Sequence, residues 1–294
     1  MGGCGGRRGG DRVGGMAGAR RRGTPSRPLG GESRFPAPRP RPAAGRGQVV
    51  RGSAGAARVS GERSVMVESD PAPAGPVLAI ETSGRVGSVA LAVGGAETAT
   101  ATLDGLPGLA EALIPAIRSV RAEAEFGVDR IAAVVVGAGP GSFTGVRIAG
   151  AAAKALASSL EVPLYAPSSL RAAAVAGGPI VPDRRPEHRY VLFDARRGRV
   201  YGACYDVGPT GVREVSGPHG GTIVDVINGR PPVGTIFMGE GAALHEALLD
   251  VAGFTVRPPP AGIPTARGLL ACCDWVPVDP ETWEPEYVRE WKPG

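Results

Sequence analysis

A continuous apolar run, Ile131 to Val136, leads directly into a glycine-rich segment, Gly137 to Gly145. A strand that is apolar on both faces belongs inside a parallel sheet with helices covering both sides. The residues that follow, to about Leu160, have the apolar spacing of a helix. This strand, loop and helix restrict the chain to an α/β fold built on a largely parallel sheet.

The unit belongs to a pattern that occurs twice, each time beginning with three short strands and continuing with alternating helices and strands. The expected strands are residues 77–80, 88–93, 97–102, 131–136 and 164–166, then 190–194, 200–206, 212–215 and 236–238. The expected helices are residues 106–120, 146–160, 222–227 and 242–251. Two similar units predict duplicated RNase H-like subdomains of the actin-type ATPase (ASKHA) architecture, at residues 77–176 and, in a smaller copy, 188–291.

Residues 1–69 differ sharply in composition from the rest of the chain. They contain 14 Arg, no Lys, four acidic residues, 17 Gly and 6 Pro. Such a segment cannot bury enough apolar surface to form a core, so we expect a disordered extension. It carries a charge of +10, which leaves the remaining residues at −5 within the net +5 of the chain. An RNA-binding arm, an organellar transit peptide and a misassigned start, with the native protein beginning near Met66, are all consistent with it.

The sequence also bears on the cellular location of the protein and on whether it forms disulfides or binds a metal. No apolar run reaches the length of a membrane span, and no apolar segment follows the early arginines as a secretory signal requires. We therefore expect a soluble, cytoplasmic protein without a membrane partner. The four cysteines, Cys4, Cys204, Cys272 and Cys273, include no C-x-x-C pair, so we expect neither a disulfide framework nor a zinc site. We also expect no metal and no cofactor.

The glycine-rich loop lies between a strand and a helix, where free backbone N–H groups and the helix dipole favour an anion. Ser142 or Thr144 can cap the helix. The loop contains no G-x-x-x-x-G-K-[ST] sequence and fails the dinucleotide fingerprint. A vestigial phosphate-binding loop and a simple tight turn both stay open. The residues of the phosphate-binding interpretation are Glu81, Gly139, Gly141, Ser142, Thr144, Gly145 and Arg147.

The exact sequence of the loop is more informative about function than its capacity to bind an anion. Residues 139–148 read Gly-Pro-Gly-Ser-Phe-Thr-Gly-Val-Arg-Ile, and this stretch resembles the most characteristic segment of the TsaB family. Other stretches agree with that family in order and spacing: residues 78–83, 88–91, 113–115, 167–170, 194–201, 239–241 and 285–289. The resemblance covers about residues 77 to 291 and is strongest from Ile131 to Leu170.

The resemblance implies a reaction and a set of partners. Family members are non-catalytic dimerisation subunits that support a TsaD-like catalytic subunit. That partner transfers a threonylcarbamoyl group to the adenosine adjacent to the anticodon in tRNAs reading codons that start with A. The resemblance also implies an ATPase subunit (TsaE-like) or a homodimer as further assemblies, and contact with tRNA indirectly, through the complex.

One departure from the family bears on catalysis. Glu81 stands where the family usually has Asp. In active members of the actin-like class this carboxylate helps to hold the metal and orient the phosphate, and one extra methylene displaces it by an amount that matters for rate. Glu81 therefore fits a subunit without catalytic residues.

The two helices that precede and follow the apolar strand are the expected association surface, because family members pair through them. The first carries an apolar stripe, and the second has a face rich in small residues. The candidate contacts are Leu109, Leu113, Ile117, Ala149, Ala153 and Leu156. The alternative is that these stripes face the sheet as ordinary core. On the first interpretation, Gly150→Arg abolishes pairing and leaves the fold intact.

Three other functions compete with this interpretation. A metal-dependent transferase or peptidase needs clustered ligands, but His188, His219 and His245 lie far apart and are expected as surface or loop residues. An ATP-dependent phosphotransferase would use Glu81 and the glycine-rich loop. An RNA-binding protein would act through the arginine-rich extension, whereas Arg196 and Arg199 are expected in a solvated hairpin turn rather than against RNA.

Overall fold

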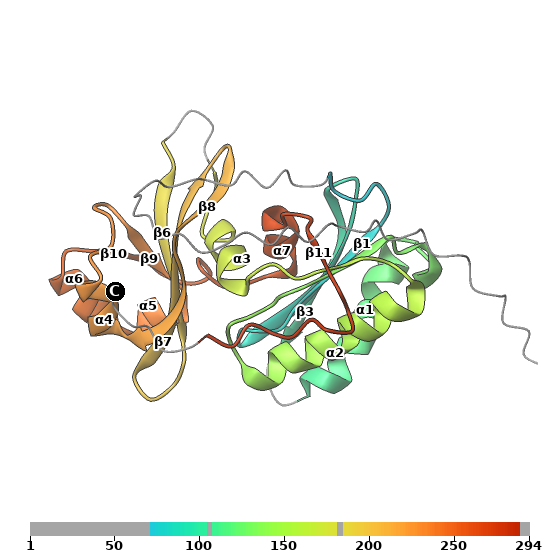
Figure 1. Ribbon diagram of the computed structural model, residues 1–294, viewed down its shortest axis with the longest axis horizontal. Helices are drawn as coiled ribbons and strands as arrows, with labels where there is room; N and C mark the ends of the chain where they lie inside the picture. The colour runs from blue at the N-terminus through green and yellow to red at the C-terminus, as the bar shows by residue number, and fades with distance from the viewer. Residues whose placement is uncertain (1–70, 105–107, 181–184, 289–294) are drawn as a thin grey trace, which may run out of the picture. The chain divides into compact units, whose positions relative to one another are not determined.

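The computed structural model describes residues 71–104, 108–180 and 185–288. The expected disordered extension at residues 1–69 lies outside them. Two mixed sheets form the scaffold (Figure 1).

The first sheet has six strands in the order β11-β5-β4-β1-β2-β3. Its strands are β1 (Val77–Glu81), β2 (Val86–Val93), β3 (Ala96–Asp104), β4 (Ala133–Val136), β5 (Leu164–Tyr165) and β11 (Pro277–Val278). Strands β1, β2 and β3 form an antiparallel meander, and β1, β4 and β5 run parallel to one another. The predicted parallel position of the apolar run is thus confirmed, because β4 lies between β1 and β5.

The second sheet has five strands in the order β10-β9-β6-β7-β8. Its strands are β6 (Glu187–Asp194), β7 (Arg199–Gly208), β8 (Gly211–Thr222), β9 (Ile236–Met238) and β10 (Thr255–Arg257). Again the first three strands are antiparallel, and β6, β9 and β10 run parallel. Apart from the additional β11, both sheets have the same strand order and directions, which confirms the predicted duplicated α/β fold class.

Helices cover both faces of the first sheet. The long helices α1 (Leu109–Glu123) and α2 (Phe143–Leu160) pack on the face to which Leu78 and Ile80 point. Between α1 and β4 lies a short 3₁₀ helix, η1 (Val128–Arg130). Helix α7 (Ala266–Cys272) packs on the other face against Val77 and Ala79 (Figure 1). Successive side chains of β1 therefore point alternately into two cores, one on each face of the sheet, as expected for a strand buried on both sides.

Helix α3 (Ser169–Val175) connects the two sheets. Ala172 belongs to the core beneath α7, whereas Leu170, Ala173 and Ala174 pack with Val191 and other residues of the second sheet. The far face of that sheet is covered by α4 (Ile223–Asn228), α5 (Glu240–Leu244) and α6 (Glu246–Val251). The small side chains of α3 allow it to be buried between two layers.

Some elements differ from the sequence expectation. The single helix expected at residues 242–251 is two short helices, because His245 between them has a non-helical backbone (φ −113°, ψ 19°). Strand β11 and helix α7, from the region assigned to the second subdomain, join the first sheet. The division into subdomains at residues 77–176 and 188–291 otherwise stays a prediction. Among the described residues, no helix is long and apolar enough to cross a membrane.

Candidate functional site

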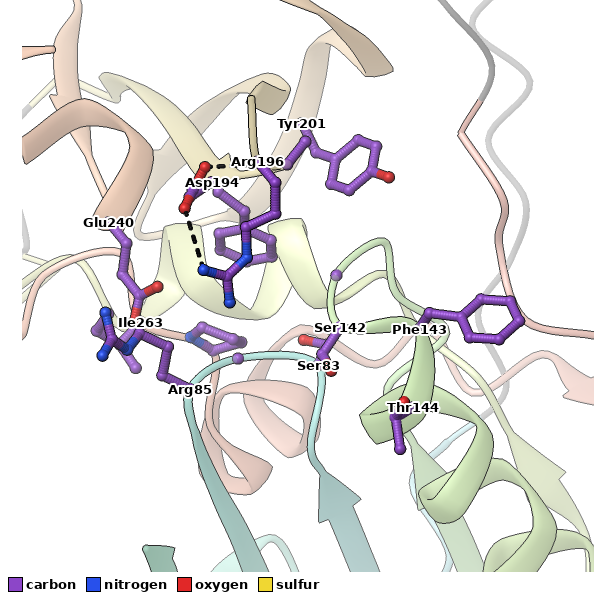
Figure 2. A pocket seen from close by; sticks show the side chains of 15 residues that line it. Ser83, Arg85, Ser142, Phe143, Thr144, Asp194, Arg196, Tyr201, Glu240 and Ile263 are labelled. Carbon is purple, nitrogen blue, oxygen red and sulfur yellow. Dashed lines mark hydrogen bonds and ion pairs between the residues drawn. The ribbon is translucent and has the colours of Figure 1, made fainter. Parts of the chain in front are cut away.

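A cleft of about 320 Å³ opens between the glycine-rich loop and the second sheet (Figure 2). The turn after β1 contributes Ser83 and Arg85, and the start of α2 contributes residues 141–144. The opposite wall comes from the end of β6, from Tyr201 on β7 and from Glu240 at the start of α5. The ends of β1, β4, β6 and β9 thus meet here, which is the usual place for a site in an open α/β sheet.

The loop is held against the turn after β1 by close backbone approach. A Cβ atom at Gly145 would overlap the carbonyl oxygen of Thr82, and one at Gly141 would overlap that of Ser83. The Thr82 hydroxyl donates to the Gly145 carbonyl at 2.7 Å. These two glycines are therefore required by packing, whether or not the loop binds an anion.

Most of the loop's N–H groups are used within the chain. The N–H of Ser142 donates to the Ser83 carbonyl at 2.7 Å, that of Gly139 to the Ser169 hydroxyl at 3.2 Å, and that of Gly145 to the Ser142 side chain at 3.2 Å. Ser142, rather than Thr144, is the N-cap of α2. Within the described residues, the N–H groups of Gly141, Phe143 and Thr144 remain without a partner at the cleft. The capacity for an anion is correspondingly small.

The predicted loop residues are divided by the structure. Gly141, Ser142 and Thr144 line the cleft, whereas Gly139, Gly145 and Arg147 do not. The Arg147 guanidinium lies 3.9 Å from the centre of the Phe143 ring and donates to the Tyr287 hydroxyl at 3.0 Å, which directs it along the outside of α2.

Glu81 is sealed away from the cleft. Its side chain is fully buried, accepts the Ser83 N–H at 2.6 Å and the Ser169 hydroxyl at 2.8 Å, and lies under Gly137, where a Cβ atom would overlap Oε2. Burial raises the pKa of this carboxyl, and the hydrogen bonds from Ser83 and Ser169 partly offset that rise. The carboxylate cannot reach a metal or phosphate in the cleft unless this packing is broken.

The cleft is lined by two basic side chains, Arg85 and Arg196, and two acidic ones, Asp194 and Glu240. Asp194 accepts the backbone N–H of Arg196 at 2.8 Å, and the Arg196 guanidinium lies 4.0 Å from the same carboxylate. Burial raises the pKa of Glu240, Arg85 lowers it, and Asp194 raises it further (Figure 2). The cleft therefore lacks the concentrated positive charge that a triphosphate requires.

Cleft-lining residues missed by the sequence interpretation include Ser83, Arg85, Asp194, Tyr201 and Glu240. A signal for them was present, because several lie in the stretches that resemble the TsaB family and directly after strands. Ser169, which binds Glu81, lies in another such stretch. The carboxyl ends of parallel strands lie at one edge of a sheet, and this rule would have predicted that these cleft-lining residues lie together.

The expected association surface is largely core in this structure, which corrects that prediction. Leu109, Leu113, Ile117, Ala149 and Ala153 are all buried against the first sheet, and Leu156 is half-buried at the edge of the same core. The sheet's apolar face needs these side chains, so they are not available on the surface. The alternative stated from the sequence describes these residues better.

Gly150 is covered by the chain itself. A Cβ atom there would lie 3.3 Å from the Trp283 ring, and the Lys154 ammonium donates to the Trp283 carbonyl at 2.9 Å. Figure 1 shows the C-terminal segment running along α2. Gly150→Arg would displace this segment, so it is not the clean interface variant that the sequence suggested.

The histidines do not gather. His219 is buried on β8, with Nε2 2.9 Å from the Tyr190 hydroxyl, which corrects its expected surface position. His188 pairs with Asp206 on neighbouring strands, and His245 lies between α5 and α6. Across the part of the chain that the structure describes, no group of three His, Cys, Asp or Glu side chains could hold a metal ion.

Comparisons with known proteins agree with this geometry. The family model of TsaD, tRNA N6-adenosine threonylcarbamoyltransferase, matches residues 108–246. The chain is 33% identical over 150 residues to the tRNA threonylcarbamoyladenosine biosynthesis protein TsaB of Bacillus subtilis. YeaZ from Pseudomonas aeruginosa is similar in structure, with a TM-score of 0.60 and 25% identity over 73% of this chain and 100% of that chain. The chain is similar to TsaB-family proteins in both sequence and structure.

The extent of the match differs from one relative to another. The alignment with the Bacillus subtilis protein covers 48% of this chain and 60% of that protein, which is less than two thirds of its length. An uncharacterized protein of Mycobacterium tuberculosis, Rv3421c, is 36% identical over 180 residues, which cover 61% of this chain and 74% of that protein. The predicted resemblance to the TsaB family is confirmed.

Proposed function

We propose that this chain is a non-catalytic dimerisation subunit of a tRNA-modifying complex. In this proposal it supports a TsaD-like partner, which transfers a threonylcarbamoyl group to the adenosine adjacent to the anticodon. The TsaB relatives of Bacillus subtilis and Haemophilus influenzae carry the name of this biosynthesis, which supports the assignment. The cytoplasm, where tRNA is modified, is the proposed location, and a TsaE-like ATPase and a homodimer are the proposed further assemblies.

The burial of Glu81 carries the non-catalytic part of the proposal. An actin-like phosphotransferase needs a carboxylate at the end of its first strand that faces the nucleotide and its metal. Here that carboxylate is bound by Ser83 and Ser169 beneath the loop, and the loop's own N–H groups are mostly satisfied. An enzyme built for phosphate chemistry would present these groups to the cleft.

The outer faces of α1 and α2 are the revised candidate for the association surface. Ile114 is 46% exposed, and Ala151 and Ala155 are exposed one turn apart on α2. Small side chains allow a partner helix to approach closely, and an exposed isoleucine supplies apolar area. The predicted helices are retained in this proposal, but the opposite faces are assigned to the partner.

Co-purification with the TsaD-like subunit tests the pairing. Ala151→Arg places a long charged side chain at the centre of the proposed surface and should reduce co-purification at least about tenfold, as expected for a charge without a partner in an interface. Ala252→Arg, at an exposed position after α6, is the matched control and should pair like the wild type. Equal pairing by Ala151→Arg would exclude this surface.

A further inference from the structure

An exposed aromatic and arginine cluster lies at the outer edge of the cleft. It consists of Phe143, Arg147 and Tyr287, and both of its rings are open to solvent, with Phe143 58% and Tyr287 51% exposed. The centres of the two rings are 6.1 Å apart. Arg147 links them, because its guanidinium lies over the Phe143 ring and donates to the Tyr287 hydroxyl. Exposed aromatic rings that the chain itself fixes in place are typical of a binding surface.

A small pocket of about 120 Å³ adjoins this cluster. Phe143, Tyr287 and Tyr201 line it together with Pro140 and Glu286. Phe143 and Tyr201 also line the larger cleft, and Figure 2 shows both rings reaching outward on the same side, away from Arg85 and Glu240. A flat ring entering here would meet aromatic faces from α2 and from β7, and Glu286 could accept a hydrogen bond from its amino group.

Two further arginines lie on the hairpin that forms one wall of the cleft. Arg196 is 80% exposed at the tip of the β6–β7 hairpin, and Arg197 beside it is exposed and, within the described residues, forms no ion pair. Both adopt left-handed backbone conformations, with φ of 69° and 53°, which form the tight turn. The turn therefore presents two guanidinium groups on the hairpin that leads to Tyr201, which lines both the cleft and the small pocket, in a part of the chain whose net charge is negative.

We propose that the aromatic cluster and this hairpin form a contact for an unpaired segment of RNA, with a base stacking on Phe143 or Tyr201 and the phosphates meeting Arg196 and Arg197. Aromatic rings and guanidinium planes are the surfaces on which unpaired bases stack, and arginines supply the charge for the phosphates. Arg196 is only loosely paired with Asp194, at 4.0 Å, and Arg197 forms no ion pair within the described residues, so a phosphate fits this turn better than an apolar protein surface would. The identity of the RNA as a tRNA loop rests on the proposed function, whereas the contact itself does not.

Fluorescence of a stem–loop RNA with the full chain tests the contact. The probe carries 2-aminopurine either in its loop or in its stem. Wild-type protein should quench the loop base but not the stem base, because stacking on an aromatic ring quenches this fluorophore. Phe143→Ala should weaken binding about tenfold and remove the quenching, and Phe143→Trp should restore both. The arginine-rich extension is present in every variant, so its contribution to affinity cancels.

The arginines are tested by salt dependence. Arg197→Gln should lower the slope of log affinity against log salt by about one. Val251→Ala, 88% exposed on α6, and Arg118→Gln, exposed on α1, are matched controls that should leave quenching and slope unchanged. Because Phe143 is largely exposed, its variants should melt within about 2 °C of the wild type.

Two results would overturn the proposal. In one, Phe143→Ala binds and quenches like the wild type, which assigns any RNA affinity to other parts of the chain. In the other, Phe143→Ala loses a protein partner while its RNA binding is unchanged, which makes the cluster a protein surface. Failure of the chain to pair with a TsaD-like subunit would instead count against the proposed function alone, because the RNA assay uses the isolated chain.

Discussion

Leu113→Ala tests whether the apolar stripe of α1 is core. Leu113 is 1% exposed and packs in the core between α1, α2 and the first sheet. Removing three buried carbon atoms there should lower the free energy of unfolding by about 3 kcal/mol, because the lost burial and the remaining cavity add. With a urea m-value of about 3 kcal/mol/M for a chain of this size, the midpoint should fall by about 1 M.

The assay is urea unfolding followed by circular dichroism, with co-purification of the proposed TsaD-like partner measured below the transition. Leu244→Ala, 62% exposed at the end of α5, is the matched control and should change the unfolding free energy by less than about 0.5 kcal/mol. Leu113→Ala should be destabilised and still pair. A variant of unchanged stability that no longer pairs would show that Leu113 belongs to the interface, and the assignment of this stripe to the core would be wrong.

Three further predictions follow from the same structure. Gly145→Ala forces a methyl group onto the Thr82 carbonyl and should lower the free energy of unfolding by about 1–3 kcal/mol, measured by urea unfolding, with an unchanged midpoint arguing against the close approach. Burial and the nearby Glu214 raise the pKa of Glu286 to about 6 from 4.5, so its contribution to folding stability is complete below pH 4.5 and is lost as the pH rises through 6. The unfolding free energy of Glu286→Gln should therefore gain up to about 1 kcal/mol over that of the wild type between pH 4.5 and 7.5, allowing for the partial exposure of this side chain. A difference that does not change with pH would refute this. Burial raises the pKa of Cys204 and of Cys272 to about 12, so neither thiol should be alkylated by iodoacetamide at pH 8 until the chain is unfolded, and rapid labelling of the native protein, read by mass spectrometry, would contradict that burial.

Local pattern was enough to predict the sheet architecture. The β-branched run that became β4 has one stable environment, between parallel strands, and the repeated three-strand pattern predicted both sheets. Strand β11 and helix α7 were not predicted, because two- and seven-residue elements carry little periodicity. Their positions depend on the first sheet, more than 100 residues earlier in the chain.

The candidate site was less predictable, because long-range packing decides it. Glu81 is sealed by Ser169, 88 residues away, and nothing local to Glu81 indicates that partner. The apolar stripe of α1 would look the same whether it faced a sheet or another protein, and the sheet occupies it here. Gly150 lies beneath Trp283, which joins α2 only through the fold. An amphipathic pattern identifies a face that will be buried but not what covers it.

The central claim is that this chain supports catalysis by another subunit without contributing a catalytic carboxylate. Formation of threonylcarbamoyladenosine on substrate tRNA tests it most directly, with purified TsaD-like partner, threonylcarbamoyl adenylate and either wild-type chain or Glu81→Gln, and with nucleosides quantified by mass spectrometry. The account predicts no product from this chain alone and equal rates for the two forms when each is paired with the partner. Product from the chain alone, or a folded and paired Glu81→Gln complex that has lost activity, would contradict it.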